Sequence, residues 1–428
     1  MAEYRIKGGR RLLGEAGAPG SKNAALPILA ATVLGGRSVI HNCPDISDVR
    51  CTVEILTALG CDVSYDGHTV TVDARGISSH VLPKEHMEKM RSSIIFAGGL
   101  LSRFGQFTAH YPGGCKLGER PINLHLSAFK QLGATVEESE QKEGGIIVAK
   151  AEKLAGDKIY LNIPSVGATQ NIMLAATLAQ GTTVVQNAAK EPEVTDLQNF
   201  LVAAGAKISG AGSSIIVIEG VRELRDTEYT VMPDRIVAGT YLAAAAITGG
   251  AIRLKNIVHH DMRPIVEKFI DMGSFVTLEE GAICLTAPQR LHGLGYLTTQ
   301  PHPGFPTDMQ PQFMAMLACA HDNTTIEETL FTSRDKHVPE LIKMGAKIIN
   351  RYSKFFHVNG VPQLNGATVK AMDLRGGAAL VLAGLAAHGE TIVQEARYIQ
   401  RGYQAIDSDL QALGADIKYF DPQAKICD

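Results

Sequence analysis

Six segments of the chain are apolar on nearly every side and rich in alanine and glycine. A helix that is apolar all round must be buried among neighbours, because none of its faces prefers water. Each segment ends in a turn and is followed by the β-branched alternation typical of a strand. The pattern therefore predicts six buried helices. They begin near Lys22, Arg91, Ser165, Asp234, Thr307 and Asp373.

A second, amphipathic helical pattern alternates with the first and ends each time in the same short phrase. The copies read ALGCDV, QLGATV, AAGAKI, DMGSFV, KMGAKI and ALGADI, with glycines at positions 60, 133, 205, 273, 345 and 414. A glycine just past a helix is a common C-terminal cap, because it adopts a left-handed backbone without strain. The even spacing predicts six repeats of roughly 70 residues, each with a buried helix, an amphipathic helix and strands.

Six repeats in 428 residues divide naturally into two domains of three, since single cores rarely grow to that size. We predict an α/β fold of two inside-out domains, each of three pseudo-repeats with buried helices and outer sheets. The first domain is residues 22–232 and carries a lid loop around Cys115. The second is residues 1–21 plus 233–428 and carries Asp308 and Arg401. We expect the active site in the cleft between them.

Composition excludes several classes of function. With 45% hydrophobic residues, 20% charged residues and a formal charge of −3, the chain has no charge excess that would favour nucleic acid or a membrane surface. Its seven scattered cysteines lack Cys-x-x-Cys spacing, which is typical of a reducing compartment and argues against a disulfide framework or structural zinc. No signal peptide or membrane-spanning run is evident. We expect a soluble, cytoplasmic protein with no obligate protein partner.

One stretch, YPGGCKLGERPINLHL at Tyr111–Leu126, places a thiol among cations. Cys115 follows two glycines and precedes Lys116 and Arg120, and a helix is predicted to begin at Pro121. Positive neighbours and a helix N-terminus both lower the pKa of a thiol. A lone cysteine is more often a small buried hydrophobe, but a polar, glycine-rich loop is no core position. We predict a reactive thiol.

Polar residues open the six predicted buried helices. N-terminal capping explains the serines, threonines and some aspartates. It does not explain Lys22 or Arg91, because a cation at a helix start opposes the helix dipole. An anion held between such cations and the helix amides would explain them. If the helix starts face one cleft, Lys22, Arg91, Arg120 and Arg401 surround an anion there, with Asp308 as a lone carboxylate. Such a site suits a small substrate with phosphate and carboxylate groups.

Together, PGSKNAALP, PGGCKLGERPI, PSVGAT, PGFPTDMQPQF, DLRGGAALVLAG and QRGY make a specific set of motifs over nearly the whole chain. The set resembles the UDP-N-acetylglucosamine 1-carboxyvinyltransferase family, the enolpyruvyl transferases that open peptidoglycan synthesis and that fosfomycin targets. The resemblance implies transfer of enolpyruvate from phosphoenolpyruvate to the sugar 3-hydroxyl, with release of phosphate. It also implies that no metal or cofactor takes part, and a role in cell wall biogenesis, cell shape and cell division.

The resemblance carries roles onto matching positions. Lys22, Arg120 and Arg401 would hold phosphoenolpyruvate, and Asp308 would take the hydroxyl proton. Cys115 would protonate the methylene carbon, add covalently to the substrate or aid product release. The residues expected to contact the UDP-sugar are Asn23, Arg91, Arg120, Pro121, Ile122, Asn123, Leu124, Ser165, Val166, Gly167, Asp308 and Leu330.

Thr332 and Asp335, around Arg334, depart from the commonest family pattern with no assigned effect, and two further departures fall on nucleotide contacts. Asn123 stands where the family often has Asp, and Ile163-Pro164 stand where some members carry Lys shortly before the Ser-Val-Gly run. These two departures would affect the affinity for the nucleotide more than the catalytic activity.

Other readings remain open on sequence grounds. A shikimate-pathway enolpyruvyl transferase shares the architecture, although its loop resembles Ser-Lys-Ser and it does not depend on a lid thiol. A catalytically silent paralogue would bind the UDP-sugar as a sensor. The run His259-His260-Asp261 could suggest a metal, but it lacks a third ligand at suitable spacing, so a helix-start cap is the preferred interpretation.

Overall fold

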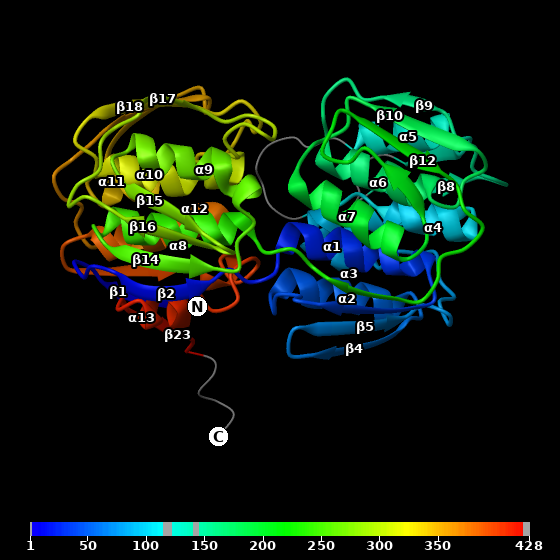
Figure 1. Ribbon diagram of the computed structural model, residues 1–428, viewed down its shortest axis with the longest axis horizontal. Coiled ribbons are helices and arrows are strands. Elements are labelled where there is room, and N and C mark those ends of the chain that lie inside the picture. The colour runs from blue at the N-terminus through cyan, green and yellow to red at the C-terminus, as the bar shows by residue number, and fades with distance from the viewer. Residues whose placement is uncertain (1, 114–121, 140–144, 423–428) are drawn as a thin grey trace. The chain divides into compact units, whose positions relative to one another are not determined.

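The computed structural model describes residues 2–113, 122–139 and 145–422, and divides the chain into two compact units (Figure 1). Unit 1 combines residues 2–19 with residues 233–422, and unit 2 lies within residues 20–232. Each unit has its own buried hydrophobic core, and the two cores share none of the described residues.

Unit 2 contains three sheets with strand orders β13-β3-β5-β4, β6-β8-β7 and β11-β12-β10-β9. Its helices are α1 (Lys22–Ala31), η1 (Thr32–Leu34), α2 (Ser47–Ala58), α3 (Lys84–Lys89), η2 (Arg91–Ile95), α4 (Phe96–Phe104), α5 (Asn123–Gln131), α6 (Val166–Ala176) and α7 (Pro192–Ala203). Its strands are β3 (Arg37–His41), β4 (Asp62–Asp66), β5 (Thr69–Asp73), β6 (Gln106–His110), β7 (Thr135–Glu138), β8 (Ile146–Lys150), β9 (Lys158–Tyr160), β10 (Thr182–Gln186), β11 (Lys207–Ser209), β12 (Ile215–Glu219) and β13 (Thr227–Thr230).

Unit 1 repeats the plan with sheets β15-β16-β14-β2, β17-β18-β20-β19 and β21-β22-β1-β23. Its helices are α8 (Arg235–Ile247), α9 (His259–Asp271), η4 (Thr307–Met309), α10 (Gln310–Ala318), α11 (Val338–Lys343), α12 (Leu374–Ala386), η5 (Ala396–Tyr398) and α13 (Ile406–Ala412). Its strands are β1 (Glu3–Lys7), β2 (Leu13–Gly17), β14 (Ala251–Lys255), β15 (Phe275–Glu279), β16 (Ala282–Thr286), β17 (Gly295–Thr298), β18 (Asn323–Glu327), β19 (Lys347–Arg351), β20 (Phe355–Asn359), β21 (Thr368–Lys370), β22 (Glu390–Gln394) and β23 (Asp416–Phe420).

The apolar helices lie inside each unit and the sheets outside, as the hydrophobic pattern predicted. In unit 1 the helices α8, α10 and α12 are buried along nearly their whole length and pack against one another. In unit 2, α1 and α6 are buried along nearly their whole length, α4 is buried over Phe96–Leu101, and α4 packs against both α1 and α6. Figure 1 shows the strands running around the outside of these helices in each unit. The helices are thus held by apolar burial, at roughly 25 cal/mol per Å² of apolar surface removed from water.

The repeat glycines end the amphipathic helices as predicted. Gly60, Gly133, Gly205, Gly273, Gly345 and Gly414 all have φ between 92° and 104°. That backbone region is strained for residues with a Cβ, which is why the sequence keeps glycine there. The glycine therefore marks the end of each repeat's outer helix in both the sequence and the fold.

Helix starts were predicted less well. Ser165, Asp234 and Asp373 cap α6, α8 and α12 with their side chains, as expected. However, Arg91 and Thr307 open the short 3-10 helices η2 and η4.

The helix predicted to begin at Pro121 is also misplaced. It is α5, which begins at Asn123, while Pro121 itself lies outside the described residues.

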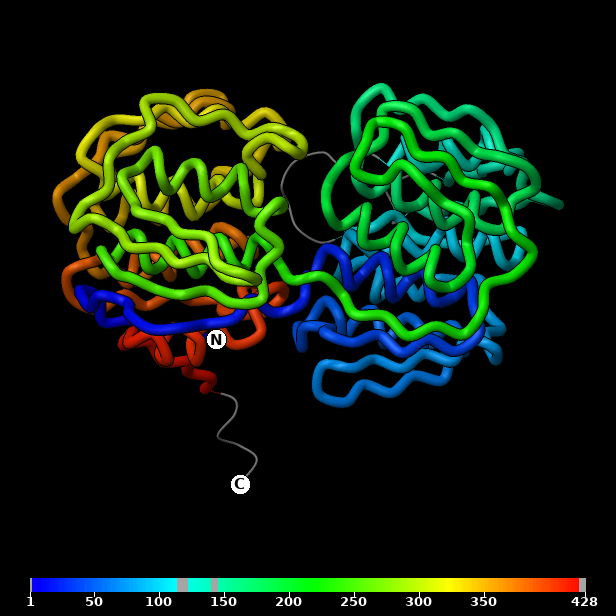
Figure 2. The backbone as a smooth tube through the Cα atoms, in the orientation of Figure 1, coloured from blue at the N-terminus to red at the C-terminus, as the bar shows by residue number. Residues whose placement is uncertain are grey.

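The first strands of the chain join the sheets of unit 1 (Figure 2). β1 lies between β22 and β23 and pairs antiparallel with both, and β2 pairs parallel with β14. The segment EYRIKGG thus has its strand partners in the C-terminal half of the chain. Where the chain passes between units, the Asp234 amide donates to the Pro19 carbonyl, and the Ser21 amide donates to the Met232 carbonyl, both at 2.8 Å.

Among residues 2–113, 122–139 and 145–422, no helix combines the length and the hydropathy needed to cross a bilayer.

Candidate active site

Asp308 occupies η4 in unit 1 and is held by two buried arginines. Its Oδ1 accepts from Nη2 of Arg334 at 2.9 Å, and its Oδ2 accepts from Nε and Nη2 of Arg375 at 3.2 and 3.1 Å. The Asp308 side chain is 25% exposed, whereas those of Arg334 and Arg375 are 3% and 5% exposed. The expectation of a lone carboxylate is therefore wrong. The sequence concealed the pairing because the two arginines lie 26 and 67 residues away.

This pairing sets the charge of Asp308. Burial alone would raise its pKa, but the charges of Arg375 and Arg334, with their hydrogen bonds, outweigh burial and hold the pKa far below its ordinary value. Burial likewise disfavours the charged Arg375 guanidinium, and the Asp308 charge more than compensates. Asp308 is thus an ionised carboxylate with one quarter of its surface open to a ligand.

Glu328 arranges the residues beside Asp308. This buried carboxylate accepts hydrogen bonds from the Thr307 hydroxyl at 2.9 Å and from the Leu330 amide at 2.9 Å. Arg334 donates in turn to the Thr307 carbonyl at 2.9 Å. One buried acid therefore ties the η4 start to Leu330, a predicted nucleotide contact whose side chain stays 40% exposed. No sequence motif indicated this role.

Arg401 lies in unit 1, just after η5. The next residue, Gly402, packs so closely on α12 that a Cβ there would come within 2.7 Å of the Leu374 side chain. The backbone next to Arg401 therefore lies against the first turn of the helix that carries Arg375.

In unit 2, Lys22 begins α1 directly after the cap Ser21. Its Nζ lies 2.7 Å from Oδ2 of Asp48, and both side chains are at most 10% exposed. The ion pair offsets the cost of placing a cation at a helix N-terminus. Asn23 follows and is exposed. The sequence analysis missed Asp48, which belongs to the next helix.

The predicted nucleotide contacts of unit 2 lie at two helix starts that pack together. Asn123 and Leu124 open α5 behind Ile122, while Val166 and Gly167 open α6 behind its cap Ser165. The two starts meet where a Cβ on Gly167 would lie 3.2 Å from the His125 ring. Exposed amides at a helix start suit a phosphate group.

His125 stays neutral at this junction. Burial, together with the smaller effect of the Arg91 charge, lowers its pKa to about 4. Its Nδ1 lies 2.8 Å from Nδ2 of Asn171, whose Oδ1 accepts from the Gly98 amide, so Nδ1 must be the acceptor. Arg91, at the start of η2, is thus close enough for its charge to lower the pKa of His125. Both residues belong to the same region as Gly167.

Several predicted residues lie outside the described part of the chain. These are Cys115, Lys116, Arg120 and Pro121.

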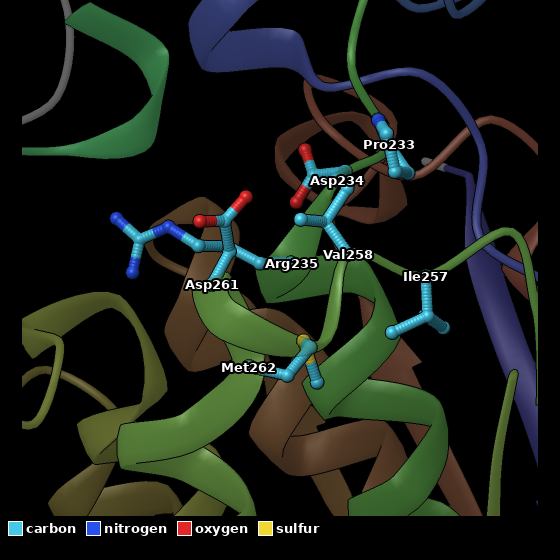
Figure 3. A pocket seen from close by; sticks show the side chains of 7 residues that line it. All are labelled: Pro233, Asp234, Arg235, Ile257, Val258, Asp261 and Met262. Carbon is cyan, nitrogen blue, oxygen red and sulfur yellow. The ribbon is translucent and has the colours of Figure 1, made fainter. Parts of the chain in front are cut away.

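Two pockets in unit 1 do not match the predicted site. One of about 10 Å³ is lined by Pro233, Asp234, Arg235, Ile257, Val258, Asp261 and Met262 (Figure 3). It has room for no more than about one water molecule. The other, of about 600 Å³, is lined partly by Ala246, Met316 and Ala386, at the C-terminal ends of α8, α10 and α12. It therefore lies at the opposite ends of these helices from Asp308 and Arg375.

The structure corrects the interpretation of the run His259-His260-Asp261. His259 begins α9, but the cap is Val258, so the proposed helix-start cap is wrong. The His259 Nε2 instead lies 2.9 Å from the Ala282 carbonyl.

Within the described residues, one group could hold a metal, namely Cys51, Glu54 and His86, whose ligand atoms lie within 4.8 Å of one another. The His86 Nε2 lies 3.0 Å from Oε2 of Glu54, and this hydrogen bond accounts for their closeness without a metal.

Comparison with known proteins places the chain in a family. Residues 6–410 match the model of the EPSP synthase (3-phosphoshikimate 1-carboxyvinyltransferase) family. A UDP-N-acetylglucosamine 1-carboxyvinyltransferase 2 from Caldanaerobacter subterraneus is 48% identical over 97% of this chain and 99% of its own. A UDP-N-acetylglucosamine 1-carboxyvinyltransferase from Finegoldia magna is 45% identical over 98% and 99%.

Solved structures agree with the fold. The enolpyruvyl transferase NikO from Streptomyces tendae superposes with a TM-score of 0.88 at 27% identity, covering 98% of each chain. An EPSP synthase from Acinetobacter baumannii, at 19% identity and a TM-score of 0.75, shares the fold. The chain belongs to the carboxyvinyl (enolpyruvyl) transferase family, among relatives named UDP-N-acetylglucosamine 1-carboxyvinyltransferase.

Proposed function

We propose that this protein transfers the enolpyruvyl group of phosphoenolpyruvate to the 3-hydroxyl of UDP-N-acetylglucosamine, releasing phosphate, in peptidoglycan synthesis. The observation that carries the proposal is Asp308, a carboxylate kept ionised between two buried arginines and partly open to a ligand. The names of relatives at 45% and 48% identity support the choice of acceptor. We also propose a cytoplasmic location, which the scattered cysteines favour.

The reaction needs an acid and a base on opposite sides of one substrate. Addition of the hydroxyl to the enol places a proton on the methylene carbon while the neighbouring carbon becomes cationic. We propose that Asp308 takes the hydroxyl proton as the sugar oxygen bonds to the carbon that carries phosphate, and that Cys115 protonates the methylene carbon or adds covalently to the phosphate-bearing carbon. Loss of a proton from the resulting methyl group and departure of phosphate from its neighbouring carbon then restore the double bond. General acid and base groups each contribute about two to four decades of rate.

The substrate anions need cations. We propose that Lys22, Arg120 and Arg401 hold phosphoenolpyruvate. Holding both substrates together would supply a further, entropic share of the rate.

We propose that the nucleotide binds at Ile122–Leu124 and Ser165–Gly167. The two helix starts that pack together there support this assignment. The further contacts proposed for the UDP-sugar are Asn23, Arg91, Arg120, Pro121, Asp308 and Leu330.

Asp308 is a weak base while both arginines hold it, because its pKa lies far below the ordinary value. Phosphate and carboxylate groups compete for guanidinium donors in the same forked geometry as an aspartate. Substrate binding that draws Arg334 or Arg375 away would raise the pKa of Asp308 and ready it to accept a proton. Pairing with Arg334 and Arg375 thus keeps the Asp308 carboxylate ionised until the substrates bind.

Steady-state phosphate release tests the proposal. Phosphoenolpyruvate is supplied with either UDP-N-acetylglucosamine or shikimate 3-phosphate as acceptor. The proposal predicts phosphate release when UDP-N-acetylglucosamine is the acceptor, and none when shikimate 3-phosphate is the acceptor. Release with shikimate 3-phosphate would assign the shikimate-pathway reaction instead. Tight binding of the UDP-sugar with no release from either mixture would identify a catalytically silent paralogue.

A further inference from the structure

A chain of buried polar groups connects Asp308 to the segment of Arg401. Tyr403, two residues after Arg401, is only 1% exposed, and its hydroxyl lies 2.8 Å from the Thr240 hydroxyl on α8. Its ring and hydroxyl also face Arg375, whose Nη1 is 3.5 Å from the Tyr403 oxygen and whose guanidinium carbon is 5.8 Å from the ring centroid. Tyr403 therefore contacts the same arginine that binds Asp308.

The direction of these hydrogen bonds follows from the neighbours of Thr240. The Thr240 hydroxyl donates its single proton to the Ile236 carbonyl at 2.8 Å. Its oxygen can then only accept, and it receives Nε2 of Gln312 at 3.1 Å as well as the Tyr403 hydroxyl. Tyr403 must be the donor to Thr240. The lone pairs of the Tyr403 oxygen are thus left for two donors, Nη1 of Arg375 at 3.5 Å and Nε2 of Gln312 at 3.4 Å.

This polarity constrains the guanidinium of Arg375. Nε and Nη2 reach Asp308, and Nη1 reaches the Tyr403 oxygen, so donors on both sides of the planar group have partners. A guanidinium held at both sides and over an aromatic ring has little freedom to rotate.

The same tyrosine also fixes the Arg401 segment. The Gly402 and Tyr403 amides both donate to the Ile399 carbonyl, at 3.1 Å each. Gly402 abuts Leu374 at the start of α12. With the Tyr403 side chain held between α8 and α12, Arg401 has firm attachments on its C-terminal side.

We infer that Tyr403 is a positioning residue, which aligns Arg375 with Asp308 and sets Arg401 beside them through one hydroxyl shared with Thr240. This inference rests on the proposed function for its kinetic consequences. Its structural consequence, the alignment of the Arg375 and Asp308 pair, does not depend on the reaction.

The charged and titratable groups around the pair are few. Asp308 is faced by Arg334 and Arg375, and Arg375 by Asp308, Tyr403 and Asp234. A loosened Arg375 would therefore weaken the hold on the Asp308 charge, with Arg334 alone remaining. The part of acid stability that depends on Asp308 should then fall.

The test compares Tyr403→Phe with Tyr241→Phe. Tyr241 is as deeply buried in the same unit, and its hydroxyl bonds Asp409 rather than the Asp308 network. Both variants lose one buried hydroxyl, so both should lose some stability at pH 7. Only Tyr403→Phe should lower kcat, on the order of ten-fold, and raise the KM for phosphoenolpyruvate while leaving the KM for the UDP-sugar unchanged. Equal kinetic losses in both variants would overturn the inference.

Changes at Thr240 supply a second test. Thr240→Ser keeps the acceptor and should retain most of the rate, whereas Thr240→Val removes it and should resemble Tyr403→Phe. The double variant Thr240→Val with Tyr403→Phe should be no slower than either single variant, because both act through one hydrogen bond. Additive losses would contradict this.

A readout without turnover separates the inference from the proposed function. Unfolding of wild type, Tyr403→Phe, Tyr241→Phe and Asp308→Asn is measured from pH 7 to pH 3. Tyr403→Phe should lose part of the acid dependence that Asp308→Asn removes. Tyr241→Phe should keep that part, because its lost hydrogen bond alters the titration of Asp409 instead. An unchanged acid dependence in Tyr403→Phe would refute the positioning role even if the enzyme proved to use another acceptor. Absence of phosphate release by the wild type would refute only the proposed function.

Discussion

Replacing Asp308 by asparagine removes the proposed base and leaves two buried arginines without their carboxylate. The amide keeps the shape of the side chain, so binding of the UDP-sugar should survive. Loss of a general base lowers kcat by about 10²- to 10⁴-fold. Direct titration of UDP-N-acetylglucosamine into the variant, followed by phosphate release under saturating substrate, separates binding from turnover.

The same change has a cost in stability that can be estimated. Breaking a buried ion pair from one side costs about 3–5 kcal/mol. Because Asp308 is 25% exposed, water can partly solvate what remains, so we take about 3 kcal/mol. In a unit of this size each kcal/mol corresponds to about 2–4 °C, which predicts a fall of about 6–12 °C in the unfolding temperature of unit 1. Differential scanning calorimetry measures it.

The pH dependence follows from the direction of the Asp308 shift. Its folded-state pKa lies below the unfolded value of about 3.9, so the unfolded chain binds the proton first. The Asp308 contribution is therefore fully present above about pH 5 and is lost as the pH falls below about 4. The free energy of unfolding of Asp308→Asn should therefore lack this part of the fall at acid pH.

Asp335→Asn is the matched control, because Asp335 lies next to Arg334 in the chain but bonds Asn350 and Ser353 instead. It should keep the wild-type kcat. An Asp308→Asn variant that turns over near the wild-type rate would refute the reasoning about the base, and one with unchanged stability would refute the reasoning about the arginine pairs.

Other predictions concern unit 2 and the thiol. Lys22→Met should raise the KM for phosphoenolpyruvate and, by removing the buried ion pair with Asp48, destabilise unit 2 by about 3–5 kcal/mol, as thermal unfolding would measure; a variant with unchanged KM would contradict the role of Lys22. His125, with its pKa lowered to about 4, should lose stability as the pH falls from about 6.5 to about 4, by about 3 kcal/mol, and His125→Gln should flatten that slope in urea unfolding. Fosfomycin should alkylate Cys115, whereas Cys43, whose thiol pKa burial raises to about 12, should stay unmodified in peptide maps; modification spread over other cysteines would count against a specially reactive Cys115.

The sequence predicted the architecture well because the architecture depends on local signals. Alanine-rich apolar helices can only be buried, and a helix that ends at φ near +95° selects glycine, so Gly60 and its equivalents mark every repeat. The short signals also have limits. Polar Thr307 and Asp308 were expected to open a buried helix, but they form the 3-10 helix η4, and α10 begins only at Gln310, directly before Pro311.

The partners of the candidate site were beyond the reach of such signals. Asp308 meets Arg334 and Arg375, and Lys22 meets Asp48, only because the fold brings segments distant in the chain together. No spacing rule connects residues that far apart in the chain. Sequence patterns identified the charged groups, and only the fold shows which opposite charge each one faces.

The most direct measurement uses phosphoenolpyruvate labelled with ¹³C at the enol carbon, incubated with UDP-N-acetylglucosamine and the enzyme. The proposed reaction predicts that ¹³C NMR of the isolated nucleotide sugar shows the labelled carbon in an ether bond to O3 of the glucosamine ring. A labelled carbon found only in unreacted substrate, or attached at another position, would contradict it.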